Sequence, residues 1–169
     1  ITSFAKIMSG GLPGGAFGGT DEVMAIFDPF ADQPLWQSGT FNGNAVTMVA
    51  GVAALEQFGA DEVTRINRLG DQLRSRIGLL LEMYGFEAVV TGYGSFGAIH
   101  FTSGAVRNYR DAARSNQQLK KVLHLALLQE GLFVAPRLMF CISTPMSEST
   151  LDEIDARFER ALKRLDDVR

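Results

Sequence analysis

Lys6 is the residue of this sequence best suited to covalent chemistry, because it stands just ahead of a run of glycines. The stretch from Ser3 to Gly19 reads SFAKIMSGGLPGGAFGG. Glycine has no Cβ, so the backbone can turn tightly there and approach a ligand closely. A neutral lysine amine attacks carbonyl carbons and forms an imine. Two interpretations are open from these residues: an imine-forming lysine on a glycine-rich turn, or an ordinary surface lysine.

A second stretch, SGTFNGNAVTMVAG, joins polar residues to an apolar, alanine-rich segment. The pattern predicts a helix from Ala45 to Phe58 that is closed by Gly59. Thr40 would then lie just ahead of a helix N-terminus, where free N–H groups favour an anion. From the residues alone, Thr40 is either a ligand of that anion or, together with Asn42, a cap of the helix.

The two stretches together resemble the cofactor-lysine region of the pyridoxal-phosphate-dependent class III aminotransferases. The resemblance is to the group of the glutamate-1-semialdehyde aminomutases and β-amino-acid aminotransferases. Ala5 and Ser9 depart from the family pattern, which often has glycine at both places. The stretches follow each other in the family's order and at its spacing. The resemblance covers essentially all of this chain, but only the C-terminal portion of a family enzyme, from the cofactor lysine onward.

This resemblance implies an α/β protein of fold type I. Residues 1–58 would form the end of the large cofactor-binding domain and the connecting helix, and residues 59–169 the small C-terminal domain. It also implies that Lys6 is catalytic and binds pyridoxal 5'-phosphate covalently. Gly39 and Thr40 would contact the cofactor phosphate of a neighbouring subunit, so that a homodimer shares its active sites.

The activity that the resemblance implies is transfer of an amino group between an amino acid and a keto acid or aldehyde. An aminotransferase and an aminomutase fit equally well, and a racemase of the same family uses the same parts. A non-catalytic fragment or assembly module is the alternative of another class. In the family, the phosphate loop, the ring-stacking aromatic residue and the aspartate opposite the pyridine nitrogen all precede the lysine. We therefore expect an N-terminal part of the same enzyme as a partner of this chain.

Arg137 is a candidate for substrate binding. It interrupts the apolar neighbourhood from Leu132 to Cys141, where an unpaired charge is costly to bury. Some family members place a carboxylate-binding arginine in this segment, and the β-amino-acid aminotransferases have a similar Pro-Arg pair. A guanidinium group suits bidentate recognition of a carboxylate. A structural arginine, paired with an acid from the region that precedes this chain in the family, is the other interpretation.

Charge and composition exclude several classes of function. The 169-residue chain has a formal net charge of -3, which gives no basic footprint for nucleic acid. No apolar run approaches the ~18 residues of a membrane span, and no signal-peptide pattern opens the chain, so we expect a cytoplasmic protein. The single cysteine, Cys141, has no partner for an internal disulfide and no metal-ligand spacing. We expect it to pack in the core, and we expect no metal site.

The elements that must position these residues follow from hydrophobic periodicity and turn signals. The first part of the chain predicts a short buried strand at Gly15–Gly19 and a helix through Asp21 and Phe27 that Thr20 caps. The later part predicts helices over 61–84, 119–127 and 150–165, with strands at 88–91, 98–102, 132–134 and 139–143. Thr150 and Glu153 form a capping-box pair in this prediction.

Two sets of polar residues in the later part are interpreted as structural. His100 is expected to be a packed strand histidine, because no acid or cysteine stands at metal-ligand spacing. The arginines of the first long helix are expected to lie on a solvated face, because acids are interleaved with them. They are Arg65, Arg68, Arg74 and Arg76.

Overall fold

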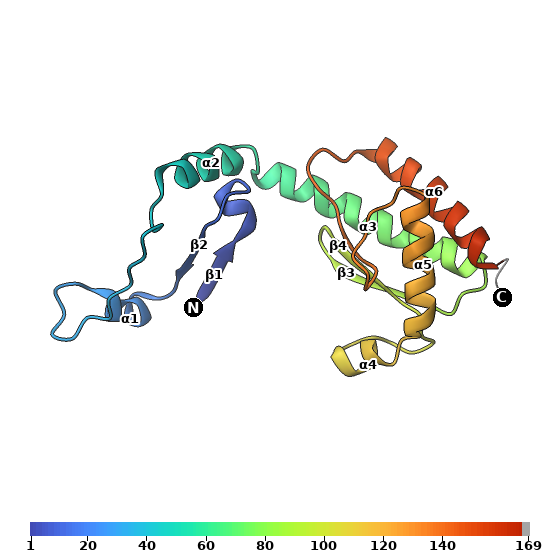
Figure 1. The fold of residues 1–169 in the computed structure, drawn as a ribbon, viewed down its shortest axis with the longest axis horizontal. Helices are drawn as coiled ribbons and strands as arrows, with labels where there is room; N and C mark the ends of the chain where they lie inside the picture. Colours follow the sequence, from blue (N-terminus) through green and yellow to red (C-terminus); the bar gives the residue numbers. More distant parts are fainter. Residues whose placement is uncertain (167–169) are drawn as a thin grey trace. The chain divides into compact units, whose positions relative to one another are not determined.

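The computed structural model describes residues 1–166. The chain divides into two compact units, Ile1–Ala60 and Asp61–Arg169, and each of them contains helices and strands (Figure 1). The predicted assignment of residues 1–58 and 59–169 to a large and a small domain stays a prediction. Within the described residues, no helix combines the length and the apolar character that a membrane span requires.

The first unit opens with an antiparallel hairpin. Its strands are β1 (Thr2–Ala5) and β2 (Gly15–Gly18), and a turn of 3-10 helix, η1 (Lys6–Ser9), lies in the connection between them. The predicted strand after the lysine segment is therefore confirmed. The prediction that it is buried is wrong, because the hairpin has only two strands and Phe17 keeps 41% of its surface exposed.

Helix α2 (Ala45–Glu56) begins where the sequence predicted and ends earlier than predicted. Gln57 is its C-cap in right-handed conformation, so the predicted closure by Gly59 is wrong. The reason is that the next helix begins at Ala60, and Gly59 only links the two. Ahead of α2 lie α1 (Asp21–Met24) and η2 (Ala25–Phe27). Thr20 holds the N-cap position of α1, but its hydroxyl makes no capping hydrogen bond.

The second unit combines a three-stranded antiparallel sheet with four helices in its described residues. The strands have the order β3-β4-β5, with Val89 opposite His100 and Gly97 opposite Phe140. The elements in chain order are α3 (Ala60–Met83), β3 (Val89–Tyr93), β4 (Phe96–His100), α4 (Tyr109–Ala113), α5 (Gln117–Gln129), β5 (Met139–Cys141) and α6 (Glu148–Asp166).

The three long helices of the second unit supply most of its core. The buried positions of α3 recur at three or four residues, as a helix with one apolar face requires. Leu123 of α5 and Leu151 and Leu162 of α6 are completely buried. The side chains that form this core in α3 are Ile66, Leu69, Leu73, Ile77 and Leu81.

The arginines of α3 do more than face solvent, and this prediction is corrected. Arg65 donates to the carbonyl oxygens of Met146 at 2.8 Å and Thr144 at 2.6 Å. Arg74, whose side chain is only 13% exposed, donates to the carbonyls that flank the β3–β4 turn. Their guanidinium groups hold loops against α3, because one planar fork can serve several acceptors.

Three predictions near the C-terminus also need correction. Residues 132–134 form no strand, because the chain enters a tight turn right after them. Helix α6 begins at Glu148, so Thr150 lies inside the helix and does not cap it as predicted. The Thr150 hydroxyl accepts a hydrogen bond from the Ser147 N–H at 3.1 Å. Cys141 is exposed on the edge strand β5 and is not part of the core.

Candidate functional site

Lys6 lies at a sharp reversal of the backbone. The preceding residue, Ala5, is fully extended, whereas Lys6 has φ 58, in the left-handed region. Among the described residues, only Lys6 and Leu138 are non-glycine residues with positive φ. Such a conformation costs on the order of 1–3 kcal/mol, and it persists where the surroundings impose it, often at functional sites. The left-handed conformation that places this lysine at the start of η1 therefore lowers the stability of the fold.

Helix α2 is the support that imposes this geometry. Residues of η1 and the turn after it pack directly on the helix backbone, with no side chain between them. A Cβ added to Gly51 would overlap the carbonyl oxygen of Met8, and one added to Gly10 would overlap the carbonyl oxygen of Ala50. Only glycine permits this close approach. The two stretches that the sequence singled out are thus the two halves of one packing contact.

The far side of the lysine loop is fixed by a small buried cluster. Thr47 of α2 is buried, and its hydroxyl donates to the Pro13 carbonyl at 3.4 Å. Ser9 is 1% exposed and packs against Gly14, where a Cβ would collide with the Ser9 hydroxyl. The Ser9 Oγ has no hydrogen-bond partner in residues 1–166. The loop that carries Lys6 is therefore held at both ends against one helix.

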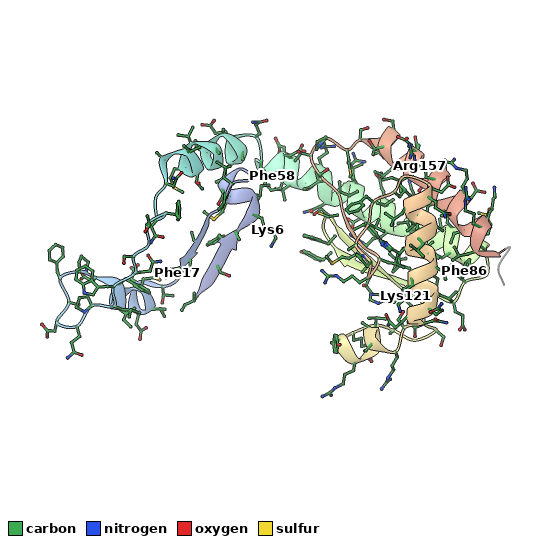
Figure 2. All side chains as sticks on the ribbon, in the orientation of Figure 1. Lys6, Phe17, Phe58, Phe86, Lys121 and Arg157 are labelled. Atoms are coloured by element: carbon green, nitrogen blue, oxygen red, sulfur yellow. The ribbon has the colours of Figure 1, made fainter. Side chains whose placement is uncertain are left out.

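The side chain of Lys6 itself is exposed (Figure 2). Within the part of the chain that the structure describes, its amine has no hydrogen-bond or ion-pair partner. A cofactor that binds through a carbonyl needs an accessible amine on a fixed support, and Lys6 meets both requirements. This residue fits pyridoxal phosphate.

Gly39 and Thr40 lie in a turn ahead of α2. The Gly39 carbonyl accepts a hydrogen bond from the Asn42 N–H at 2.9 Å, and the Asn42 side chain donates to Gln37 at 2.9 Å. Thr40 is exposed, and no described residue is a hydrogen-bond partner of its hydroxyl. The turn is thus closed by Asn42 and Gln37, which leaves the Thr40 hydroxyl available for a ligand.

Asn44 is the residue that caps α2. Its side chain accepts a hydrogen bond from the Thr47 N–H at 3.1 Å, and its Oδ1 also lies 3.4 Å from the Thr47 hydroxyl, whose single proton it shares with the Pro13 carbonyl. The alternative in which Thr40 and Asn42 cap the helix is therefore wrong. Since Thr40 has no structural hydrogen bond within residues 1–166, the ligand interpretation fits its position better than the capping interpretation.

Arg137 stands at the tip of a tight turn in the second unit. The Leu138 N–H donates to the Ala135 carbonyl at 2.7 Å, and the Ala135 N–H donates to the Met139 carbonyl at 3.2 Å. Leu138 closes the turn with φ 60 and is buried, whereas Arg137 is exposed. The only hydrogen bond that its guanidinium makes to a described residue is a long one to the Met139 sulfur, at 3.7 Å. The charge is therefore not buried in the apolar neighbourhood, and no described acid pairs with it.

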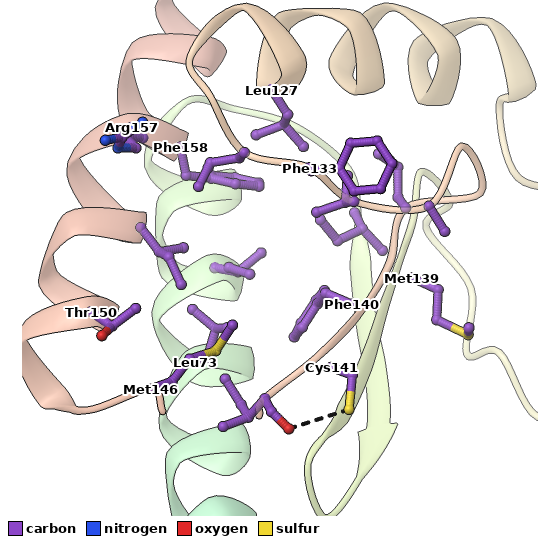
Figure 3. Close-up of a pocket in the computed structure, with 18 of the residues that line it drawn as sticks. Leu73, Leu127, Phe133, Met139, Phe140, Cys141, Met146, Thr150, Arg157 and Phe158 are labelled. Atoms are coloured by element: carbon purple, nitrogen blue, oxygen red, sulfur yellow. Dashed lines mark hydrogen bonds between the residues drawn. The ribbon is translucent and has the colours of Figure 1, made fainter. Parts of the chain in front are cut away.

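An apolar cavity of about 590 Å³ lies in the second unit, and Ala135, Leu138 and Met139 of this turn contribute to its wall (Figure 3). Its charged residues are Arg157 and Glu153, which form an ion pair with each other. Because these two charges neutralise each other, the cavity offers no free group for a carboxylate or phosphate. It therefore does not compete with Lys6 and Arg137 as a site for the expected chemistry.

His100 is buried in β4, as predicted, and it links three elements of the second unit. Lys120 Nζ on α5 lies 3.4 Å from His100 Nδ1, and His100 Nε2 lies 3.0 Å from the Thr91 hydroxyl on β3. An ammonium group only donates, so Nδ1 accepts and Nε2–H donates to Thr91. Burial and the Lys120 charge lower the pKa of His100, and burial lowers the pKa of Lys120. No group of metal-ligating side chains occurs among residues 1–166.

The candidate residues are divided between the two units of this chain. Lys6, Gly39 and Thr40 belong to the first unit and Arg137 to the second, and no hydrogen bond joins any two of them in the described residues. Several positioning residues were not found from the sequence: Gly10, Thr47, Ala50, Gly51 and Leu138. The glycine-rich composition was the only signal for them, because backbone contacts between distant segments leave no mark in local periodicity.

The Aminotransferase class-III family model matches residues 1–162 of this chain. The omega-transaminase of Sphaerobacter thermophilus is 40% identical, and its crystal structure superimposes with a TM-score of 0.88 over 95% of this chain and 37% of that protein. Beta-phenylalanine transaminase of Variovorax paradoxus is 37% identical over 153 residues, which are 90% of this chain and 35% of that protein. A beta-phenylalanine aminotransferase structure from the same organism gives a TM-score of 0.82.

Glutamate-1-semialdehyde 2,1-aminomutase of Methanobrevibacter smithii is 34% identical over 165 residues, which are 96% of this chain and 38% of that protein. The chain thus spans little more than a third of the length of these relatives. The match over nearly the whole chain and the superposition on solved transaminases confirm the α/β fold of type I. The chain belongs to the class III aminotransferase family.

Proposed function

We propose that this chain is the part of a pyridoxal-phosphate-dependent amino-transferring enzyme that carries the cofactor lysine. The observation that carries the proposal is Lys6, an exposed amine without a partner among the described residues, held in a left-handed conformation on α2. Membership of the family and relatives named as transaminases and as an aminomutase support it. Aminotransferase and aminomutase both remain candidates for the reaction.

Lys6, Gly39 and Thr40 each have a stated task in this proposal. When bound, the cofactor supplies an aldehyde for the substrate amine and a conjugated ring that accepts an electron pair. The Lys6 amine holds the cofactor between turnovers. During turnover Lys6 Nζ would take the proton from the substrate carbon that bears the amino group and deliver it to the C4′ carbon of the cofactor. The Gly39 backbone and the Thr40 hydroxyl hold the phosphate of a cofactor bound to the partner subunit.

We propose that the complete enzyme contains this chain and a preceding segment of the same polypeptide, and that it is a homodimer. The apolar surface of α2 supports this view. Val46 is 68% exposed, Val49 71% and Val52 58%, so one face of this helix exposes apolar side chains. An apolar helix face is normally buried against another part of a protein. A cytoplasmic location remains a prediction.

Arg137 is proposed to bind a substrate carboxylate. Its exposure at the tip of a turn and its lack of an acidic partner in residues 1–166 fit this role, since a guanidinium with free N–H donors can take a carboxylate bidentately. One relative is named for a β-amino acid, beta-phenylalanine. In the complete enzyme, Arg137→Ala should raise the KM for amino acids and spare amines that lack a carboxylate. An equal loss for both kinds of donor contradicts the role.

The experiment that tests the proposed function uses the complete enzyme with Lys6 changed to Ala and, separately, to Arg. Both variants should fold as the unchanged enzyme does, because an exposed side chain contributes little to stability. Both should lose amino transfer from amino acids by a factor of at least about a thousand, since the proton-transfer group and the cofactor anchor are removed. A variant that keeps full turnover, or an unchanged enzyme whose visible spectrum does not respond to pyridoxal phosphate, would favour the assembly-module alternative.

A further inference from the structure

A strongly basic segment of the second unit has no role in the proposed function. Between Phe101 and Gln129 the sequence contains one acid, Asp111, against five basic residues. Four of these bases are exposed and one, Lys120, is buried. We call the exposed four the α4 basic patch: Arg107, Arg110, Arg114 and Lys121.

On helices α3 and α6 of the second unit, by contrast, basic side chains are neutralised by acids. Arg76 pairs with Asp152 at 2.8 Å and with Asp155 at 2.9 Å, and Arg160 pairs with Glu130 at 2.7 Å. The other basic residues of α3 and α6 that pair with an acid in the described residues are Arg65, Arg68, Arg74, Arg157, Lys163 and Arg164. Pairing within the fold is therefore the rule for the surface formed by these two helices.

The α4 basic patch departs from this rule. In residues 1–166, none of its four side chains has an ion-pair or hydrogen-bond partner. The one nearby acid, Asp111, uses a carboxylate oxygen for the backbone N–H of Arg107, at 3.0 Å. The one negative charge of Asp111 cannot balance the four positive charges of the patch. The segment thus carries a local excess of positive charge, although the formal net charge of the 169 residues is -3.

Local structure brings the patch together. Arg110 lies on α4 and Arg114 is its C-cap, so they are four residues apart and share one face of the helix. Asn108 fixes the start of α4 by accepting from the N–H groups of Arg110 and Asp111. Lys121 lies on the second turn of α5, at the end of that helix that adjoins α4 (Figure 2).

An exposed aromatic residue accompanies the charges. Tyr109, between Asn108 and Arg110, is 85% exposed. Tyrosine and arginine are enriched in the centres of protein interfaces, because both combine a broad apolar surface with hydrogen-bonding groups. Exposed charges interact over about 8–10 Å at physiological salt, so the patch acts on a partner that lies directly on it.

We propose that the α4 basic patch, with Tyr109, is a docking surface for an acidic segment of a partner protein. Charge complementarity is the argument for the occupant. A short run of carboxylates matches four cations that lie on α4, on the residues that flank it and on the start of α5. Apart from the four patch residues, residues 61–169 contain 11 Lys and Arg residues against 14 Asp and Glu residues. A long nucleic acid or an anionic membrane that extends past the patch would meet this net negative charge, which disfavours both. The proposal is independent of the proposed amino transfer.

The test uses the complete enzyme and a fluorescein-labelled oligoglutamate peptide, with binding followed by fluorescence anisotropy. The variant Arg110→Gln/Arg114→Gln removes two charges from the patch. The matched control, Arg68→Gln/Lys163→Gln, removes two exposed charges that already have acidic partners. We expect saturable binding that weakens as salt rises, a loss of about tenfold in the patch variant and a change of less than about twofold in the control.

Three results overturn the proposal. The first is that the unchanged enzyme does not bind oligoglutamate, which would mean that the rest of the enzyme covers the patch. The second is an equal loss in the patch variant and the control. The third is tighter binding of a labelled oligothymidylate, or of phosphatidylserine vesicles, than of the peptide. Circular dichroism of both variants shows whether they keep the fold, and both should keep it because all four altered side chains are exposed.

Discussion

The two units of this chain are stabilised by different kinds of internal contact. Within residues 1–60, only Ser9, Thr47 and Gly51 are buried, and none of them is a large hydrophobic side chain. The buried hydrophobic core of the described chain lies entirely between Ile66 and Leu165. The second unit is thus stabilised by apolar burial. The first is shaped by backbone contacts through glycine, and its apolar surface is left uncovered.

This difference fits the proposed placement of the cofactor lysine in the first unit. A lysine loop packed on a helix through glycine contacts cannot shift without a collision, so its geometry is fixed without the bulk of a core. The bare face of α2 then remains for another surface to cover. In the second unit, by contrast, a buried leucine at position 138 closes the Arg137 turn, so the arginine rests on a core. Paired variants, one at a tightly packed position and one at an open position, test this difference between the units.

The largest expected effect is on the core of the second unit. Leu123→Ala removes a side chain with no exposed surface and should lower the free energy of unfolding by about 2–5 kcal/mol. Leu125→Ala, on the same helix but 59% exposed, should change it by less than about 0.5 kcal/mol. Thermal or chemical unfolding of the complete enzyme measures both. Equal losses would mean that this unit has no core of its own.

A second pair tests whether glycine contacts shape the first unit. Gly51→Ala should destabilise the lysine loop by about 1–3 kcal/mol and weaken cofactor binding, because the new Cβ overlaps the Met8 carbonyl. Gly78→Ala, also inside a helix but with no atom within 4 Å of the new Cβ, should raise stability by about 0.5–1 kcal/mol. If both variants keep normal cofactor affinity, the packing of α2 does not position Lys6.

Thr40→Ala sharpens the comparison within the first unit. Loss of one hydrogen bond to a charged phosphate should weaken cofactor affinity by about 1.5–3 kcal/mol. Asn44→Ala, which removes the cap of α2, should instead lower helix stability by about 1 kcal/mol. Titration with pyridoxal phosphate and thermal unfolding separate the two effects. A Thr40 variant with lower stability and unchanged cofactor affinity would contradict the phosphate role.

The smallest expected effect is a pH dependence confined to the second unit. The pKa of His100 is lowered in the folded state by burial and by Lys120, so the unfolded chain takes up a proton first as pH falls below about 6.5. Stability should therefore fall as pH drops through this range, down to the folded pKa. His100→Gln should flatten this slope in unfolding experiments at several pH values. A slope that persists in the variant would assign it to other groups.

The sequence was sufficient for the motifs and for most helices, because lysine-plus-glycine strings and apolar periodicity are local. It failed where a distant contact decides the outcome. Residues 132–134 have a strand-like composition, but they pair with no strand, because the chain enters the turn closed by Leu138 directly after them. Thr40, Asn42 and Asn44 are all good caps, and only the geometry shows that Asn44 is the one used. The contact between Gly51 and Met8 joins segments that no local pattern connects.

The central claim is that Lys6 is the residue that binds the cofactor. Borohydride reduction of the complete enzyme with pyridoxal phosphate, followed by digestion and mass spectrometry, tests it directly, because reduction makes the lysine–cofactor linkage permanent. The account predicts a pyridoxyl group on the peptide that contains Lys6, while Lys120, Lys121 and Lys163 of this chain stay unlabelled. Labelling of any of these three in place of Lys6, or an unlabelled Lys6 peptide in an active enzyme, would contradict it.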